Sequence, residues 1–321
     1  MKPFAFVFPG QGSQSVGMLD AWLDNTIVAQ TLQEASDALN EDIAALIKNG
    51  PKEALALTTN TQPVMLVSAV AAYRVWLAET GLTPSVVAGH SLGEYSALVA
   101  SGVLTLAQAA PLVRLRAQAM QDAVPVGQGA MAAILGLDAA KIIAVCADIT
   151  SAGGGIGSEN LIHSVQAANF NDPGQTVISG SKAAVDAACE QLKAAGAKRA
   201  LILPVSAPFH SQLMRPAAEK LQEALKSVTF AAPQIPVVNN IDVSVQTDAA
   251  AIKDALYRQA FGPVRWVECV AAIKARGVTT IVECGPGKVL AGLVKRIDAE
   301  LTGAALFDPA SLAEVKALLQ S

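Results

Sequence analysis

Short apolar runs alternate along the chain with longer amphipathic stretches, and this rhythm predicts a sheet covered by helices. In the outer parts of the chain the apolar runs predict strands at 4–8, 85–88, 234–239 and 280–283. The intervening stretches predict helices at 26–39, 62–79, 94–101, 106–124, 214–227, 249–260 and 266–276. We therefore expect an α/β protein with a parallel-sheet core.

The rhythm changes in the middle of the chain. There the pattern predicts a strand, a helix, two strands, a helix and a strand, at 130–135, 139–147, 162–169, 175–179, 182–195 and 198–203. This βαββαβ order is typical of a ferredoxin-like unit. We expect a ferredoxin-like small subdomain of residues 127–205, inserted into a large subdomain of residues 1–126 and 206–321. A cleft between two such units is a common ligand site.

Composition excludes several classes of function. Of the 321 residues 52% are hydrophobic and 16% charged, the net charge is −4, and the charges are scattered, which argues against nucleic-acid binding. No stretch approaches the roughly 18 uncharged apolar residues of a membrane span. The N-terminal apolar run stops at Pro9-Gly10 and lacks a cleavage site, so we predict a strand and not a signal peptide. The four cysteines lie far apart, which predicts reduced thiols in a cytoplasmic protein and no metal site.

Glycine-rich segments at 10–15, 153–157 and 285–289 lack the residues that complete a dinucleotide or phosphate loop. We therefore expect no nucleotide site. Residues 151–158 read as a flexible loop.

The segment Gly89-His90-Ser91-Leu92-Gly93 lies between an apolar run and a predicted helix. A strand, sharp turn and helix with this spacing form a nucleophile elbow, which holds a serine Oγ clear of the backbone. Ser91 is therefore a candidate nucleophile, and the Leu92 N–H is a candidate oxyanion donor. The alternative is an ordinary strand-to-helix turn.

A serine nucleophile needs a base, and the chain has three histidines. We favour His210, because it follows the serine as in α/β-hydrolases, because the His90 side chain should point away from Ser91, and because His163 lies in the inserted unit. The large subdomain is accordingly expected to be α/β-hydrolase-like. No acidic residue suggests itself as a third member, and backbone carbonyls could orient the ring. The loop around Gln11 could supply a second oxyanion donor, or could be only a glycine-rich turn.

Five motifs carry a family resemblance: Phe8-Pro9-Gly10-Gln11-Gly12-Ser13-Gln14, Gly89-His90-Ser91-Leu92-Gly93-Glu94-Tyr95, Arg116 with Met120, Pro208-Phe209-His210, and Gly285-Pro286-Gly287-Lys288-Val289-Leu290. In order and spacing, over essentially the whole chain, they resemble the malonyl-CoA:acyl carrier protein transacylases of bacterial type II fatty acid synthesis. The acyltransferase domains of polyketide synthases are relatives. The stretch at 151–158 is longer than this family leads us to expect.

The resemblance implies a ping-pong transfer without a cofactor. Ser91, activated by His210, would take the malonyl group from malonyl-CoA and pass it to the phosphopantetheine thiol of acyl carrier protein. It also implies that a backbone carbonyl holds the histidine and that Gln259 lies beside it.

Arg116 is the residue from which we predict the substrate. Arg114 and Arg116 cannot share one face of a predicted helix, so one can point into the cleft, where a guanidinium can grip a carboxylate with two hydrogen bonds. From the residues alone a surface arginine is the better interpretation, and the resemblance assigns Arg116 to the malonyl carboxylate. Phe209 and Met120 are expected to line the substrate pocket, where Leu92 and Phe209 match the malonyl-selective pattern. Phe209 should crowd an α-methyl branch, which predicts weak use of methylmalonyl-CoA.

Three other functions stay open at this point. The same elbow would serve a thioesterase or carboxylesterase, a non-catalytic scaffold could bind carrier protein, and a separate acyltransferase could serve a polyketide synthase. We expect a monomer whose partners are coenzyme A thioesters and acyl carrier protein. Because carrier proteins are acidic, docking would need local basic residues. The candidates are Lys198, Arg199, Lys288, Lys295 and Arg296.

Overall fold

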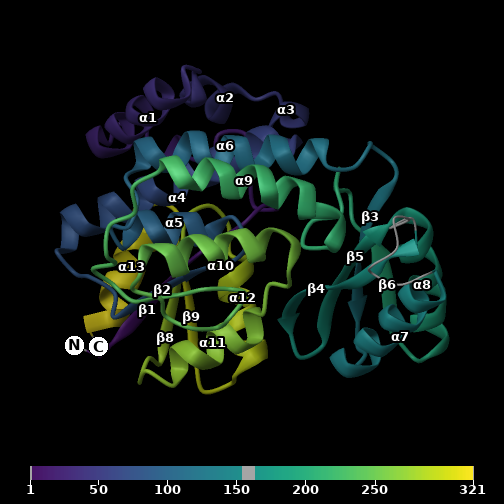
Figure 1. Ribbon diagram of the computed structural model, residues 1–321. Helices are drawn as coiled ribbons and strands as arrows, with labels where there is room; N and C mark the ends of the chain where they lie inside the picture. Colours follow the sequence, from purple (N-terminus) through teal and green to yellow (C-terminus); the bar gives the residue numbers. More distant parts are fainter. Residues whose placement is uncertain (1, 154–162, 321) are drawn as a thin grey trace.

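The computed structural model describes residues 2–153 and 163–320, which form a larger and a smaller lobe side by side (Figure 1). The expected loop at 151–158 lies largely outside the described residues. Of the helices that are described, none is long and apolar enough to cross a membrane.

A five-stranded parallel sheet forms the centre of the larger lobe, in the order β7-β2-β1-β8-β9. Its strands are β1 (Phe4–Phe8), β2 (Val86–Gly89), β7 (Val237–Val238), β8 (Thr280–Cys284) and β9 (Thr302–Leu306). The helices of this lobe are α1 (Thr26–Leu39), α2 (Ile43–Asn49), α3 (Lys52–Ala56), α4 (Thr58–Thr80), α5 (Gly93–Ala100), α6 (Leu106–Asp122), α9 (Arg215–Ser227), α10 (Ala249–Phe261), α11 (Trp266–Lys274), α12 (Val289–Ile297) and α13 (Pro309–Gln320).

The side chains of β1 alternate between the two faces of this sheet, as the two-residue period of a strand requires. Phe4, Phe6 and Phe8 pack into the cluster that includes α4, and the Phe6 ring meets the Trp76 ring edge to face at 5.4 Å. Ala5 and Val7 pack on the other side, against α11 and α12. Both faces of β1 are therefore buried, which explains the continuous apolar run in the sequence.

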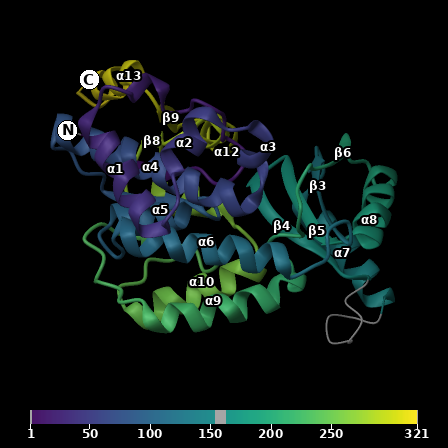
Figure 2. The same ribbon diagram turned by 90° about the horizontal axis from the view of Figure 1, so that it is seen from above.

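The smaller lobe is a four-stranded antiparallel sheet in the order β4-β5-β3-β6, with two helices on one face (Figure 2). Its elements are β3 (Gly129–Leu135), α7 (Ala139–Ala152), β4 (Val165–Asp172), β5 (Gln175–Ser181), α8 (Lys182–Ala194) and β6 (Arg199–Ile202). This order and connectivity confirm the expected ferredoxin-like arrangement. We retain 127–205 as the proposed extent of the inserted unit.

The uncovered face of the small sheet is turned toward the large lobe. Met131, Ala133 and Val177 form an apolar cluster there with Phe209, which belongs to the large-lobe segment after the insertion. The edge strand β4 also hydrogen-bonds across the boundary, because Phe170 N–H donates to Val264 O at 2.9 Å. Strand pairing as well as side-chain packing therefore joins the two lobes.

Several predicted boundaries were wrong. The helix expected at 139–147 is Ala139–Ala152, and the strand expected at 162–169 is Val165–Asp172. Two further differences have a clear physical cause. The strand expected at 234–239 is only Val237–Val238, since Pro236 has no N–H to give to a sheet. The helix expected from residue 62 begins at Thr58 and contains Pro63. A proline there leaves the Thr59 carbonyl without its helical donor, and Arg114 Nη1 donates to that carbonyl at 2.6 Å instead. α2, α3, α12, α13 and β9 were not predicted.

Candidate active site

The turn from β2 to α5 has the geometry of a nucleophile elbow. Ser91 sits at its apex with φ of 52°, in the left-handed region. A Cβ on Gly89 would stand 1.9 Å from Gly93 C, and one on Gly93 would stand 2.0 Å from Phe8 O. Only glycine fits at either position, so the two glycines let strand and helix approach closely enough to expose the serine hydroxyl.

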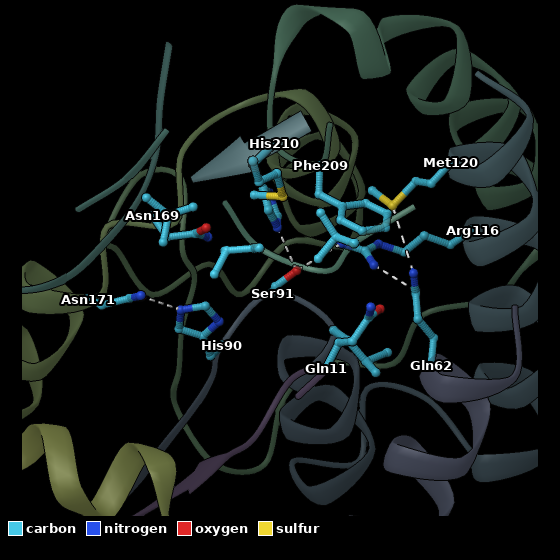
Figure 3. Close-up of a pocket in the computed structure, with 15 residues that line it drawn as sticks. Gln11, Gln62, His90, Ser91, Arg116, Met120, Asn169, Asn171, Phe209 and His210 are labelled. Atoms are coloured by element: carbon cyan, nitrogen blue, oxygen red, sulfur yellow. Dashed lines mark hydrogen bonds between the residues drawn. The ribbon is translucent and has the colours of Figure 1, made fainter. Parts of the chain in front are cut away.

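The Ser91 hydroxyl meets the His210 ring, as Figure 3 shows, with 2.6 Å between Oγ and Nε2. The other ring nitrogen, Nδ1, lies 2.9 Å from the carbonyl oxygen of Gln259 and 3.2 Å from that of Gly262. Carbonyls only accept hydrogen bonds, so these neighbours assign the ring proton to Nδ1. Nε2 is then free to accept the serine proton, which is the arrangement a general base needs.

His210 is buried, with 3% of its surface exposed. Burial and the nearby Arg116 guanidinium lower the pKa of His210 to about 3. The ring is therefore neutral at pH 7 and available as a base.

Arg116 projects from α6 into the same pocket and is 2% exposed. Its Nη1 donates to Gln62 Oε1 at 2.7 Å, and its Nη2 donates to Gln259 Oε1 at 3.1 Å. Nη2 also lies 3.3 Å from Ser91 Oγ, and the guanidinium carbon lies 5.5 Å from the centre of the Tyr95 ring. A positive charge is thus held beside the candidate nucleophile, in a fixed orientation.

Polar groups beneath the elbow fix the backbone of Ser91. Its N–H donates to Asn240 Oδ1 at 2.8 Å, and its carbonyl accepts from Gln259 Nε2 at 3.0 Å. The buried Glu94 carboxylate accepts from Asn240 N–H at 2.8 Å and from Gln259 Nε2 at 3.0 Å. Burial raises the pKa of Glu94 to about 7, although these donors and the Arg116 charge oppose the rise.

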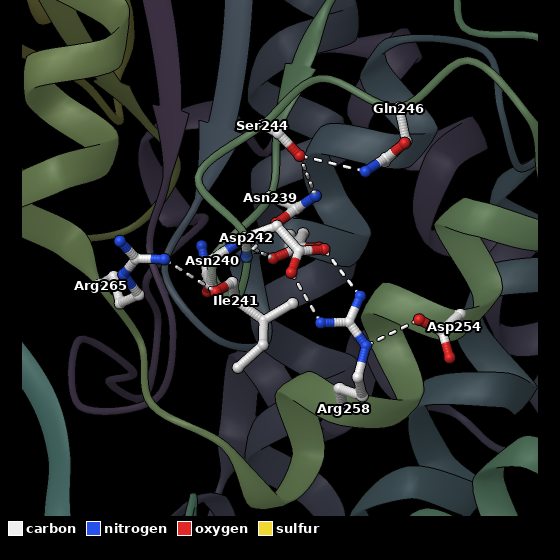
Figure 4. Close-up of polar contacts among 10 residues, drawn as sticks. Asn239, Asn240, Ile241, Asp242, Ser244, Gln246, Asp254, Arg258 and Arg265 are labelled. Carbon is white, nitrogen blue, oxygen red and sulfur yellow. Dashed lines mark hydrogen bonds and ion pairs between the residues drawn. The ribbon is translucent and has the colours of Figure 1, made fainter.

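The loop that carries Asn240 is itself tied to α10 (Figure 4). Both Asp242 carboxylate oxygens accept from the Arg258 guanidinium, each at 2.7 Å. That pairing lowers the pKa of Asp242. Arg258 neighbours Gln259, so one turn of α10 holds both the loop and the contacts to Ser91.

Two backbone amides at the pocket are candidates to bind an oxyanion. The Leu92 N–H lies at the start of α5, and within the described chain neither it nor the Gln11 N–H donates to another protein group. The Gln11 loop lies against the elbow, since a Cβ on Gly10 would stand 2.7 Å from His90 O. Thr58 Oγ1 donates to Gln11 Oε1 at 2.9 Å and ties the loop to α4.

These groups line a pocket between the lobes of about 730 Å³, counting its open mouth. The large lobe contributes Gln11, Gln62, His90, Ser91, Leu92, Arg116, Met120, Phe209 and His210, and the small lobe and its exit contribute Met131, Asn169, Asn171, Val177, Leu203 and Val205. All the candidate catalytic, oxyanion-binding and substrate-binding residues line this pocket except Gln259, which contacts Arg116 and His210 from outside the lining. The five basic docking candidates do not line it.

Some contacts and residues of the site were not predicted from the sequence. His90 points away from Ser91, as expected, and its Nε2 lies 2.9 Å from Asn171 Oδ1 in the small lobe. Gln62 and Asn240 also had no predicted role. Gln62 gave a signal, because it is a polar residue at the start of an apolar helical stretch. Asn240 gave another, because it follows a parallel strand at the end where α/β sheets bind ligands.

A serine hydroxyl beside a neutral histidine and two free amides can attack an acyl carbon and stabilise the oxyanion that forms. This chemistry, on an α/β-hydrolase-like lobe, defines the class as an acyl-transferring enzyme with a serine nucleophile. The chain belongs to the acyl transferase domain family, which matches residues 5–304.

Individual relatives cover nearly the whole chain. The malonyl CoA-acyl carrier protein transacylase of Salmonella typhimurium is 54% identical over 313 residues, covering 97% of this chain and 98% of the relative. That of Escherichia coli K12 is 52% identical over 314 residues, with 98% of each covered. The crystal structure of an acyl-carrier-protein S-malonyltransferase from Burkholderia pseudomallei is 62% identical, with a TM-score of 0.92 over 98% of this chain and 99% of that one. A malonyl-transacylase solved with its type II polyketide synthase acyl-carrier protein is 49% identical, with a TM-score of 0.93 over 99% and 100%.

Proposed function

We propose that the protein transfers the malonyl group of malonyl-CoA to the phosphopantetheine thiol of acyl carrier protein, for fatty acid synthesis. The observation that carries this proposal is the Arg116 guanidinium, buried and 3.3 Å from Ser91 Oγ. In a malonyl thioester the carboxylate is separated from the reacting carbonyl carbon by one methylene, so a cation beside the nucleophile fits it. The names of the relatives point to the same substrates.

In the first half-reaction, Ser91 Oγ attacks the thioester carbonyl carbon of malonyl-CoA while His210 Nε2 takes the hydroxyl proton. The Leu92 and Gln11 amides stabilise the oxyanion, and each such donor is worth about 3–4 kcal/mol in the transition state. The carbon–sulfur bond then breaks, and coenzyme A leaves with the proton from His210. The product is a malonyl ester of Ser91.

The second half-reaction reverses these roles. The carrier thiol gives its proton to His210 and its sulfur attacks the ester carbonyl. The carbon–oxygen bond to Ser91 then breaks, and His210 returns the proton to the serine oxygen. The chain's own groups perform each of these steps, so we propose that no cofactor takes part.

Arg116 provides the preference for malonyl over acetyl. Hydrogen bonds between charged groups contribute roughly 1.5–3 kcal/mol, enough for at least a tenfold preference. The guanidinium is already held by Gln62 and Gln259, so little conformational freedom is lost when the carboxylate binds.

We also propose that the protein acts as a monomer in the cytoplasm. The basic residues named above are retained as candidates for carrier docking. Arg296 already lies 3.4 Å from Asp172 of the small lobe, which makes it the least available of the five for an acidic partner.

Intact-mass spectrometry tests the proposal. Malonyl-CoA should add one malonyl group to the wild-type protein and none to Ser91→Ala, and carrier protein bearing its phosphopantetheine arm should then remove it. An adduct lost to water at the same rate with or without carrier would instead identify a hydrolase. Absence of any adduct would exclude malonyl-CoA as the donor.

A further inference from the structure

The backbone of His210 is held in an unfavourable conformation. Its φ is 59°, in the left-handed region that residues other than glycine seldom adopt. Such a conformation is unfavourable in free energy and persists only where the surroundings fix it. Contacts to this backbone therefore help to decide where the imidazole points.

One side chain from the other lobe makes those contacts. Gln166 lies half-buried on β4, and its Nε2 donates to His210 O at 3.2 Å. Its Oε1 accepts from Gln212 N–H at 3.0 Å. The two bonded backbone groups flank Ser211, so the amide pairs with the loop as a neighbouring strand would. Within the described chain no other donor reaches the His210 carbonyl.

The same strand also reaches the segment that holds the ring. Val264 N–H donates to Ala168 O at 2.8 Å, and Phe170 N–H donates to Val264 O at 2.9 Å. Two residues before Val264 stands Gly262, whose carbonyl lies 3.2 Å from His210 Nδ1. β4 therefore contacts both the backbone of His210 and the segment that supplies one acceptor for its ring.

We infer that Gln166 is a positioning residue for His210, through which the small lobe holds the imidazole in line with Ser91. This inference rests on His210 being the base in the proposed function. Within the described chain Gln166 neither lines the pocket nor hydrogen-bonds to Arg116 or to the elbow, so it should affect proton transfer and leave malonyl-CoA binding unchanged.

Two variants distinguish the hydrogen bond to the His210 carbonyl from the hydrogen bond to the Gln212 N–H. Gln166→Leu removes both hydrogen bonds, whereas Gln166→Glu keeps the acceptor for Gln212 N–H and the size of the side chain but loses the donor to His210 O. Gln175→Leu is the matched control, because Gln175 is a half-buried glutamine on the adjacent strand β5 and its side chain has no hydrogen bond within the described chain.

The first measurement is the rate of malonyl-enzyme formation at varied malonyl-CoA. We expect both Gln166 variants to lower the maximal rate roughly five- to twentyfold, since a misplaced catalytic group costs rate steeply. The half-saturating concentration should stay within about twofold, and Gln175→Leu should match the wild type. The inference would be overturned if Gln166→Glu kept the wild-type maximal rate, or if the variants changed only the half-saturating concentration of malonyl-CoA.

The second measurement is the rate at which a fluorophosphonate labels Ser91. In this reaction the serine oxygen bonds to phosphorus, fluoride leaves and His210 Nε2 takes the hydroxyl proton, so no malonyl group or carrier is needed. Labelling should slow in parallel with acylation in both Gln166 variants. Parallel slowing in a protein that failed to transfer malonyl would support Gln166 while rejecting the proposed function. Unchanged labelling beside normal malonyl transfer would reject Gln166 alone.

Discussion

Gln62 of α4 holds Arg116 of α6 by a hydrogen bond of 2.7 Å from Arg116 Nη1 to Gln62 Oε1. The other end of the Gln62 amide donates to Thr58 Oγ1 at 3.2 Å, and Thr58 Oγ1 in turn donates to Gln11 Oε1. A series of side-chain hydrogen bonds thus connects the guanidinium to the loop that carries Gln11, a candidate oxyanion donor.

Replacement of Gln62 by leucine should therefore lower kcat/KM for malonyl-CoA more than kcat/KM for acetyl-CoA. Loss of one hydrogen bond to a charged group predicts a fall in kcat/KM for malonyl-CoA of roughly tenfold, with a smaller effect on acetyl-CoA. Steady-state kinetics with both thioesters measure this difference. Gln118→Leu, on the exposed side of α6, should leave both values unchanged, and equal losses for the two thioesters in Gln62→Leu would argue against the assigned role.

Arg116 and Arg114 give a second comparison on one helix. Arg114 points away from the pocket, toward Glu41 and the Thr59 carbonyl. Arg116→Lys should lower malonyl transfer roughly ten- to a hundredfold, because an ammonium cannot reproduce the paired hydrogen bonds. Arg114→Lys should preserve the malonyl preference. Initial rates with malonyl-CoA and acetyl-CoA test both, and full activity of Arg116→Lys would refute the carboxylate contact.

The pH dependence should reflect a histidine that stays neutral. The pKa of His210 is about 3, so kcat/KM should show no loss from its protonation between pH 8 and 5. Glu94, with a pKa of about 7, ionises in the same range. The pH profile of Glu94→Gln isolates His210 and should be flat, whereas an inflection near pH 6.5 in that variant would show a normal imidazole.

The lowered pKa of His210 also makes the free energy of unfolding depend on pH. The unfolded ring takes up a proton near its usual pKa of 6.5, while the native ring does not. This group therefore favours folding above pH 6.5, and that contribution declines as the pH falls from 6.5 toward 3. Denaturant unfolding at several pH values should show a shallower acid decline in His210→Gln than in the wild type.

Phe209 should control acceptance of a branched substrate. It lines the pocket with Met120 and Leu92, close to the elbow. We expect the wild-type protein to use methylmalonyl-CoA poorly. Phe209→Ala should lower the ratio of kcat/KM for malonyl-CoA to kcat/KM for methylmalonyl-CoA by roughly tenfold, which is the effect that one added carbon has in an apolar pocket. Competition between the two thioesters gives the ratio directly. Comparable use of both by the wild type would remove this role.

Two glycine-to-alanine changes test the packing of the elbow. Gly93→Ala would put a Cβ 2.0 Å from Phe8 O, so it should lower the free energy of unfolding by about 1–3 kcal/mol or more. Gly292→Ala, inside α12 with no atom within 4 Å of the added carbon, should raise it by up to about 1 kcal/mol. Denaturant melts of both variants should move in opposite directions.

Much of this architecture could be predicted from the sequence because its signals are local. The continuous apolar runs of β1, β2 and β8 and the βαββαβ order of the small lobe were confirmed. β9 was missed because Thr302–Leu306 consists largely of small residues. Its conformation depends on α12, which packs so closely that a Cβ on Gly303 would stand 2.4 Å from Ala291 O. The first turns of α4 likewise contact a distant residue, because Arg114, more than fifty positions away, donates to the Thr59 carbonyl that Pro63 leaves without a helical donor.

The residues of the candidate site likewise fall into those that a local sequence motif marks and those that depend on distant neighbours. Ser91, His210 and Arg116 stand in short motifs, and the structure brings them into one pocket. Gln62, Asn240 and Gln166 act through neighbours that are distant in sequence. Gln62 and Asn240 gave only weak local signals, because their partners Arg116 and Ser91 become neighbours only in the folded large lobe. Gln166 gave none, since its contacts to the His210 loop form only when the two lobes come together.

Gln259 contacts the base, the guanidinium and the nucleophile at once, besides the Glu94 carboxylate. Its backbone carbonyl faces the ring of His210, its Oε1 accepts from Arg116, and its Nε2 reaches the carbonyl of Ser91. A mutation that altered acyl-group preference through this residue would also disturb the nucleophile and the base. Evolution of a preference for other acyl donors should therefore begin at residues that line the pocket without holding the catalytic groups, such as Phe209. Substitutions nearer Gln259 should be tolerated only together with compensating substitutions.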